Sequence, residues 1–213
     1  MSQTLTRTLS AVVLIPPVLA ALWLGGMYAQ ALVAVATLGL LVEWQLLCRN
    51  APSHKLAWRF FGVAYALAPM GALAWLLRQN DGQYLLCLIL AVVWGADTLA
   101  YFTGRLFGGP KLAPRISPGK TWSGAAGGWV AGILVGFIYA LWQHQSVPIW
   151  MAWGFALAII SQGGDLFESG IKRHFHVKDS GRLIPGHGGL FDRLDSLLAV
   201  APVVAIAYAL GLM

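Results

Sequence analysis

Long apolar segments dominate this sequence and decide what it can fold into. About 20 apolar residues are needed for a helix to cross the hydrocarbon core of a bilayer. Seven stretches approach that length, at residues 9–24, 27–48, 58–77, 83–103, 121–142, 148–167 and 190–212. Only 10% of the 213 residues are charged, whereas soluble domains average about 25%. The sequence therefore predicts an all-α, polytopic membrane bundle with seven transmembrane helices.

The connections between these segments are short, so one integral-membrane domain over residues 1–213 is the simplest interpretation. The first segment follows Arg7, as the apolar core of a secretory signal would. It is too long for such a core, however, and Pro16 and Pro17 interrupt it. We therefore expect this segment to be retained as a membrane anchor.

Basic residues gather on one side of the predicted membrane. If the N-terminus is cytoplasmic, every lysine and arginine except Arg78 falls on the cytoplasmic side. This bias is the positive-inside rule, so it supports both the number of segments and a cytoplasmic N-terminus. The net charge of +6 points to anionic lipid headgroups and phosphate substrates rather than to nucleic acid, because the basic residues lie between membrane segments.

Two pairs of acidic residues share a helical spacing. Asp165 and Glu168 lie three residues apart near a predicted cytoplasmic helix end, and Lys172 follows four residues later. One helix face could present all three if the helix continues. Asp192 and Asp195 repeat the spacing at the start of the last segment. Two such helix ends could bind Mg²⁺, and ion pairs with neighbouring basic residues explain the spacing equally well.

Three further features are unusual beside a membrane. Asp97 lies within an apolar run, where an ionised side chain costs about 2.5–3.5 kcal/mol, so we expect it to have a partner and a function. Residues 117–123 combine a turn, a helix start and Lys120, which suits a phosphate but also fits an ordinary helix entry. Residues 186–189, which include His187, allow either close ligand approach or a tight turn.

Taken in order, the polar motifs resemble the signature of the phosphatidate cytidylyltransferases, also called CDP-diacylglycerol synthases. The matching segments are WGADT (94–98), AYFTGR (100–105), KLAPRISPGKTW (111–122), SQGGDLFES (161–169), SGIKR (169–173), KD (178–179), LIPGHGG (183–189) and DRLD (192–195). The strong resemblance covers residues 90–200. Typical members carry about two more membrane spans before Asp97, where this chain has only residues 58–77, and the effect on lipid access is open.

The resemblance implies that CTP and phosphatidate react to give CDP-diacylglycerol and pyrophosphate. It implies Mg²⁺ as the cofactor, with a second cation left open. The metal ligands would be Asp165 and Asp192, supported by Asp195 and Glu168. The catalytic residues would be Asp165, Asp192, Lys120 and Asp195. The substrate-binding residues would be Ser117, Lys172, Arg173, Lys178, His187, Arg193 and Asp97.

The resemblance also implies a multi-pass protein of the cell inner (plasma) membrane, with its site facing the cytoplasm. A homodimer is an expectation of the resemblance alone, and no nucleic-acid partner is expected. Three rival functions are kept. They are a CTP-dependent kinase of a polyprenol- or phytol-type lipid, an ion-coupled transporter, and a catalytically weak relative that binds lipid or nucleotide.

Overall fold

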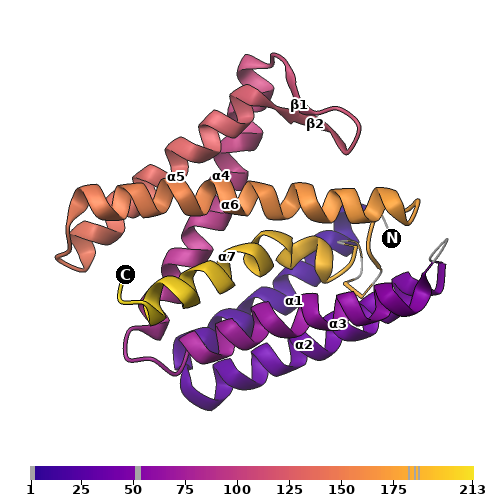
Figure 1. Ribbon diagram of the computed structural model, residues 1–213, viewed down its shortest axis with the longest axis horizontal. Helices are drawn as coiled ribbons and strands as arrows, with labels where there is room; N and C mark the ends of the chain where they lie inside the picture. The colour runs from indigo at the N-terminus through magenta and orange to yellow at the C-terminus, as the bar shows by residue number, and fades with distance from the viewer. Residues whose placement is uncertain (1–2, 51–53, 182, 185, 187) are drawn as a thin grey trace. The chain divides into compact units, whose positions relative to one another are not determined.

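The computed structural model describes residues 3–50, 54–181, 183–184, 186 and 188–213. Seven α-helices follow one another in this part of the chain (Figure 1). They are α1 (Gln3–Leu24), α2 (Gly26–Leu47), α3 (Lys55–Leu76), α4 (Gly82–Phe107), α5 (Trp122–Trp142), α6 (Val147–His174) and α7 (Phe191–Ala209). A 3₁₀ turn, η1 (Cys48–Asn50), continues α2.

Each predicted apolar segment corresponds to one of these helices, so the helical character of the chain is confirmed. Five helices, α2 to α6, are long and apolar enough to cross a membrane. The first two turns of α7 carry Asp192, Arg193 and Asp195, which shorten its apolar length. The described residues thus have the character of an integral membrane protein, and the total of seven transmembrane helices stays a prediction.

The described residues also include a β-hairpin that the sequence did not predict. Strands β1 (Lys111–Ala113) and β2 (Ser117–Thr121) pair in antiparallel fashion between α4 and α5 (Figure 1). The strands are short and contain Pro and Gly, so no alternation of apolar and polar residues announces them. The prediction of an all-α fold is therefore wrong for this segment.

The helices group into two compact units, which we describe separately. Unit 1 comprises Met1–Gln83, Ile171–Leu194 and Ala205–Met213. Unit 2 comprises Tyr84–Gly170 and Asp195–Val204. Helices α4, α6 and α7 each contribute residues to both units. The single membrane domain expected over residues 1–213 stays a prediction.

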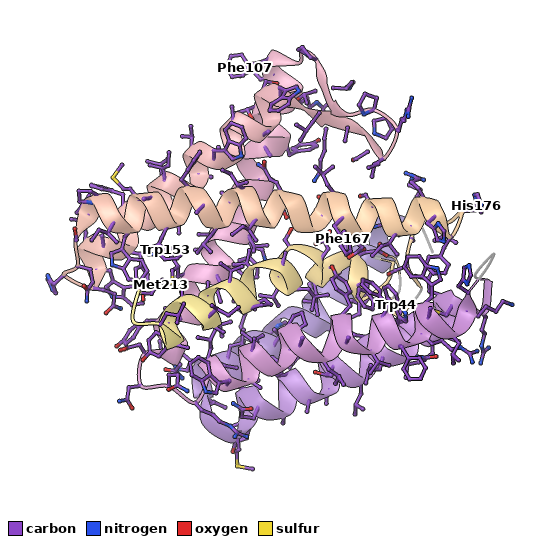
Figure 2. All side chains as sticks on the ribbon, in the orientation of Figure 1. Trp44, Phe107, Trp153, Phe167, His176 and Met213 are labelled. Atoms are coloured by element: carbon purple, nitrogen blue, oxygen red, sulfur yellow. The ribbon has the colours of Figure 1, made fainter. Side chains whose placement is uncertain are left out.

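In unit 1, helices α1, α2 and α3 lie side by side (Figure 1), and an aromatic cluster forms around Trp44 of α2. Trp44 is 1% exposed, and its indole N–H donates to the carbonyl oxygen of Trp58 at 2.7 Å. The ring of Phe191 lies 5.2 Å from that of Trp44, measured between centroids. Gly62 makes room for the indole, because a Cβ there would overlap it. Figure 2 labels Trp44.

Unit 2 is built on close backbone contacts along a glycine-rich face of α5. A Cβ at Gly132 would collide with the backbone of Gly154 in α6 and would lie 2.6 Å from Cβ of Ala158. A Cβ at Gly136 would collide with the backbone of Trp150. Small residues let helices approach closely where lipid provides no hydrophobic drive for their association. The pairing of α5 with α6 therefore depends on the absence of side chains.

Gly132→Ala is expected to destabilise the protein, because the added methyl group would force α5 away from α6. Overpacking of this kind costs about 1–3 kcal/mol, so the apparent melting temperature of the detergent-purified protein should fall. Gly71→Ala on α3 is the matched control, since a Cβ there meets no atom within 4 Å. Equal melting temperatures for the two variants would contradict the proposed packing.

Candidate active site

A cavity of about 650 Å³ in unit 2 is lined by several charged and polar residues of that unit. Helix α4, the hairpin, α5 and α6 all line it. Its charged and hydroxyl-bearing residues include Asp97, Tyr101 and Arg105 from α4, Lys111, Ser117 and Lys120 from the hairpin, and Asp165 from α6. Four of these, Asp97, Ser117, Lys120 and Asp165, were predicted as site residues from the sequence. The cavity therefore combines acidic and basic groups, as a site for a phosphate-bearing ligand requires.

An ion pair joins the hairpin to α6 within this cavity. The Lys120 ammonium lies 2.6 Å from Oδ2 of Asp165, and the two side chains are 26% and 28% exposed. The hydroxyl of Ser169, one turn further along α6, lies 3.3 Å from Oδ1 of Asp165 and donates to it. Lys120 and Asp165 thus have fixed partners yet remain open to a ligand from the cavity.

Local interactions hold the hairpin over the start of α5. Thr121 caps α5 by accepting a hydrogen bond from the Gly124 N–H at 3.1 Å, as favourable N-cap residues do. The Trp122 N–H donates to the carbonyl oxygen of Pro110 at 3.0 Å, which closes the base of the hairpin. Gly104 of α4 permits this approach, because a Cβ there would lie 2.9 Å from Oγ1 of Thr121. The cap and the hairpin closure therefore set the position of Lys120.

A second group of charged residues surrounds Asp192 in unit 1. The Lys172 ammonium lies 2.6 Å from Oδ1 of Asp192, and the side chains are 15% and 9% exposed. Oδ2 accepts hydrogen bonds from the Ser180 N–H at 3.0 Å, the Ser180 hydroxyl at 3.1 Å and the Gly189 N–H at 2.9 Å. Three possible donors thus lie within hydrogen-bond distance of Oδ2, whereas Oδ1 faces a single ammonium among the contacts described here.

The remaining predicted residues are distributed as follows. Glu168 on α6 is buried, Asp195 on α7 is half-buried, and Arg173, Lys178 and Arg193 are exposed. His187 lies outside the described residues. Asp165 and Asp192 belong to different units, so their joint role as metal ligands stays a prediction. The continuation of α6 to His174 places Asp165, Glu168 and Lys172 on one helix, as their spacing required.

Several residues of these groups were missed from the sequence. Arg105 and Lys111 lie inside the matching motifs, yet nothing in their spacing assigned them to the cavity. Ser180 carries no signal of its own. Glu43 is an acidic residue within an apolar segment, which is the same signal that singled out Asp97. In unit 1, Oε2 of Glu43 accepts hydrogen bonds from the Ser180 hydroxyl at 3.2 Å and the Phe191 N–H at 2.8 Å.

Taken together, the fold and the charged cavity define a helical integral membrane protein with groups that could bind a phosphate-bearing substrate. Residues 46–210 match the sequence model of the Cytidylyltransferase family. This protein belongs to that family, as the similarity to curated relatives also shows.

Three similar relatives are phosphatidate cytidylyltransferases by name. One from Brucella abortus biovar 1 (strain 9-941) is 47% identical over 161 residues, which is 72% of this chain and 57% of the relative. One from Rickettsia felis is 34% identical over 207 residues, covering 93% of this chain and 89% of the relative. One from Staphylococcus haemolyticus is 36% identical and covers 93% and 76%. The chain thus spans little more than half the length of the Brucella protein.

The ion pair in unit 1 should be measurable as a coupling energy. Lys172→Met and Asp192→Asn are each expected to lower the free energy of unfolding, and the double variant should lose less than the sum. Residues in direct contact typically couple by about 0.5–3 kcal/mol. Thermal unfolding of the four proteins in detergent gives the value, and the exposed Lys178→Met paired with Asp192→Asn provides the control cycle. Strict additivity for Lys172 and Asp192 would show that the pair contributes nothing.

Proposed function

We propose that this protein transfers the cytidylyl group of CTP to phosphatidate and forms CDP-diacylglycerol and pyrophosphate. The observation that carries the proposal is the cavity of unit 2, in which the Lys120–Asp165 pair lies among further cations. Family membership and the names of the relatives support the same reaction. A volume of about 650 Å³ is within the range of about 300–1,000 Å³ that is typical of small-ligand sites.

The reaction depends on the relative positions of the two substrates rather than on a strong general base. A phosphate oxygen of phosphatidate attacks the α-phosphorus of CTP, a new P–O bond forms, and the bond to pyrophosphate breaks with its electrons on the leaving group. The attacking oxygen is already anionic, so no proton must be removed from it. Catalysis then consists of aligning two anions and neutralising their repulsion.

The cations of the cavity are suited to the phosphates of the nucleotide. Lys120, Arg105 and Lys111 reach the cavity from the hairpin and the end of α4. Arg105 is also oriented by the hydroxyl of Tyr101, to which it donates a hydrogen bond at 2.8 Å. Lys172 would bind a phosphate from unit 1 through the ammonium that now contacts Asp192, and we assign Arg173, Lys178 and Arg193 to substrate phosphates as well.

Mg²⁺ is proposed as the cofactor, with Asp165 and Asp192 as principal ligands and Asp195 and Glu168 in support. Among the described residues, no three His, Cys, Asp or Glu side chains form a ready-made metal cluster. Mg²⁺ is commonly held by only one or two carboxylates together with substrate phosphates. Each principal carboxylate places one oxygen 2.6 Å from an ammonium, so both positions favour a cation. Bound there, Mg²⁺ would screen charge on the phosphates.

We further propose that seven helices cross the inner membrane of a bacterial cell, with the N-terminus and the charged cavity facing the cytoplasm. The distribution of basic residues supports this orientation. It agrees with the chemistry, since CTP is a cytoplasmic nucleotide while the acyl chains of phosphatidate can remain in the bilayer. A homodimer, a second cation and the lack of a nucleic-acid partner remain predictions.

Cysteine labelling tests the orientation. Cys48 and Cys87 are first replaced by alanine, and single cysteines are then introduced at Arg115 in the hairpin turn or at Gln145 between α5 and α6. A membrane-impermeant maleimide added to intact spheroplasts should label Gln145→Cys and leave Arg115→Cys unlabelled until the membrane is opened. The reverse pattern would overturn the proposed topology.

A transfer assay tests the reaction itself. Detergent-purified protein receives phosphatidate, Mg²⁺ and CTP labelled at the α-phosphate, and label is expected in the lipid fraction with equimolar release of pyrophosphate. Asp165→Asn and Lys120→Met should each lower the rate by about 10²–10³-fold, as loss of a transition-state electrostatic contact does. Arg78→Gln, on the predicted opposite side of the membrane, is the control with unchanged rate.

The products separate the rival functions. Label from the γ-phosphate in the lipid, with release of CDP, would identify a lipid kinase. No transfer from either phosphate by folded protein would contradict both enzymatic functions and favour a transporter or a binding protein.

A further inference from the structure

Glu43 is a completely buried carboxylate that the reaction described above does not use. It lies in the last turns of α2, and its side chain is 0% exposed. Among the described residues, no lysine, arginine or histidine forms an ion pair with it. Burial of a carboxylate is costly unless hydrogen bonds compensate. A charged group kept under such conditions calls for an explanation beyond packing.

The hydrogen bonds of Glu43 lead directly to Asp192. Oε2 of Glu43 accepts from the Ser180 hydroxyl at 3.2 Å, and the same hydroxyl lies 3.1 Å from Oδ2 of Asp192. The Ser180 N–H also donates to Oδ2 of Asp192 at 3.0 Å. A single serine therefore links the two carboxylates. Since a hydroxyl carries one hydrogen, it serves one acceptor at a time while the N–H stays with Asp192.

Glu43 also fixes the start of the helix on which Asp192 lies. Its Oε2 accepts from the N–H of Phe191, the first residue of α7, at 2.8 Å. A carboxylate beside a helix N-terminus is favoured by the helix dipole. The N–H of Phe191 thus donates to Glu43, the N–H of Ser180 donates to Asp192, and the Ser180 hydroxyl lies between the two carboxylates. The residue before Asp192 is anchored to α2.

The loop before α7 is shaped around the Glu43 carboxylate. A Cβ at Gly181 or at Gly189 would collide with Oε1 of Glu43. Gly189 is also the residue whose N–H donates to Oδ2 of Asp192 at 2.9 Å. The two glycines therefore close around the Glu43 side chain, and one of them holds Asp192 at the same time. Any movement of Glu43 would be transmitted to the donors of Asp192.

We propose that Glu43 is a positioning residue that sets the orientation of the Asp192 carboxylate through Ser180, Gly189 and the first residue of α7. Oδ2 is held by the Ser180 and Gly189 N–H groups, and the Ser180 hydroxyl lies between it and Glu43. Oδ1 is then directed to Lys172 and to the cation or phosphate that the reaction brings. The catalytic consequence rests on the proposed function, whereas the geometric consequence does not. A purely packing role for Glu43 would affect stability without changing how Asp192 and Lys172 interact.

The first test measures that interaction without any substrate. The coupling between Lys172 and Asp192, obtained from thermal unfolding of the four proteins of a double-mutant cycle, is determined again in a Glu43→Gln background. The glutamine keeps the size of the side chain but replaces one carboxylate oxygen by an NH₂ group. If Glu43 orients Asp192, the coupling should fall by at least half. An unchanged coupling, with Glu43→Gln merely less stable, would overturn the proposal.

Two matched variants keep this test decisive. Thr37→Val removes a polar group from the same helix, where its hydroxyl bonds only the Val33 carbonyl oxygen among the contacts described, and it should leave the coupling intact. Ser180→Ala removes the bridging hydroxyl but keeps the N–H bond to Asp192. It should reduce the coupling in the same direction as Glu43→Gln. If Glu43→Gln does not fold, the Ser180→Ala result decides in its place.

Steady-state kinetics of cytidylyl transfer provide the second test. Residues that support a metal or catalytic carboxylate typically change activity by about 10–100-fold, so kcat should fall by that factor in Glu43→Gln with little change in KM for CTP. The double variant with Ser180→Ala should be no slower than the slower single variant. An unaltered kcat would overturn the catalytic part. If the wild-type protein shows no transfer, the proposed function fails, and the coupling measurement still decides the role of Glu43.

Discussion

A carboxylate in apolar surroundings needs hydrogen bonds or a cation, and three of the acids in the two units show how such partners are provided. Lys120 pairs with Asp165 in unit 2, and Lys172 pairs with Asp192 in unit 1. Glu43, the most buried of these acids, instead accepts N–H and hydroxyl hydrogen bonds at Oε2. Removing one partner of such a pair costs more than the pair itself contributes. The helices and the hairpin are arranged so that these partners meet.

Much of the fold could be predicted from the sequence, because bilayer thickness imposes a length on apolar helices. Asp97 could be assigned to a site because an acid is unexpected in an apolar run, Lys120 because it lies in a turn before a helix, and Asp165 because of its helical spacing from Glu168. Ser117 was assigned through the family resemblance, and the cavity of unit 2 brings the four residues together. The hairpin could not be foreseen, since its strands span only three and five residues. The contact of Glu43 with Ser180 was equally hidden, because 137 residues separate them and no local spacing reports so distant a contact.

Family membership and the geometry of the cavity rest on different observations. Family membership follows from similarity over residues 46–210, whereas the placement of Lys120 and Asp165 follows from the hairpin and α6. The chain is much shorter than the Brucella relative, but it covers 89% of the Rickettsia felis protein of the same name. Similarity to proteins of that name therefore extends over most of this chain. The geometry adds a physical reason for particular motif residues. Thr121, for example, caps α5 and so helps to position Lys120.

The pairing of Lys120 and Lys172 with carboxylates has a consequence for the anions that these two lysines can bind. An ammonium that already contacts a carboxylate at 2.6 Å is released only by an anion that competes with that carboxylate. A phosphate monoester, which carries close to two negative charges near neutral pH, competes far better than the singly charged phosphodiester of an ordinary membrane phospholipid. The resident acids would thus keep the lysines from binding the bulk lipids that surround the protein. If the protein acts as proposed, discrimination between phosphate-bearing ligands would follow in part from this competition.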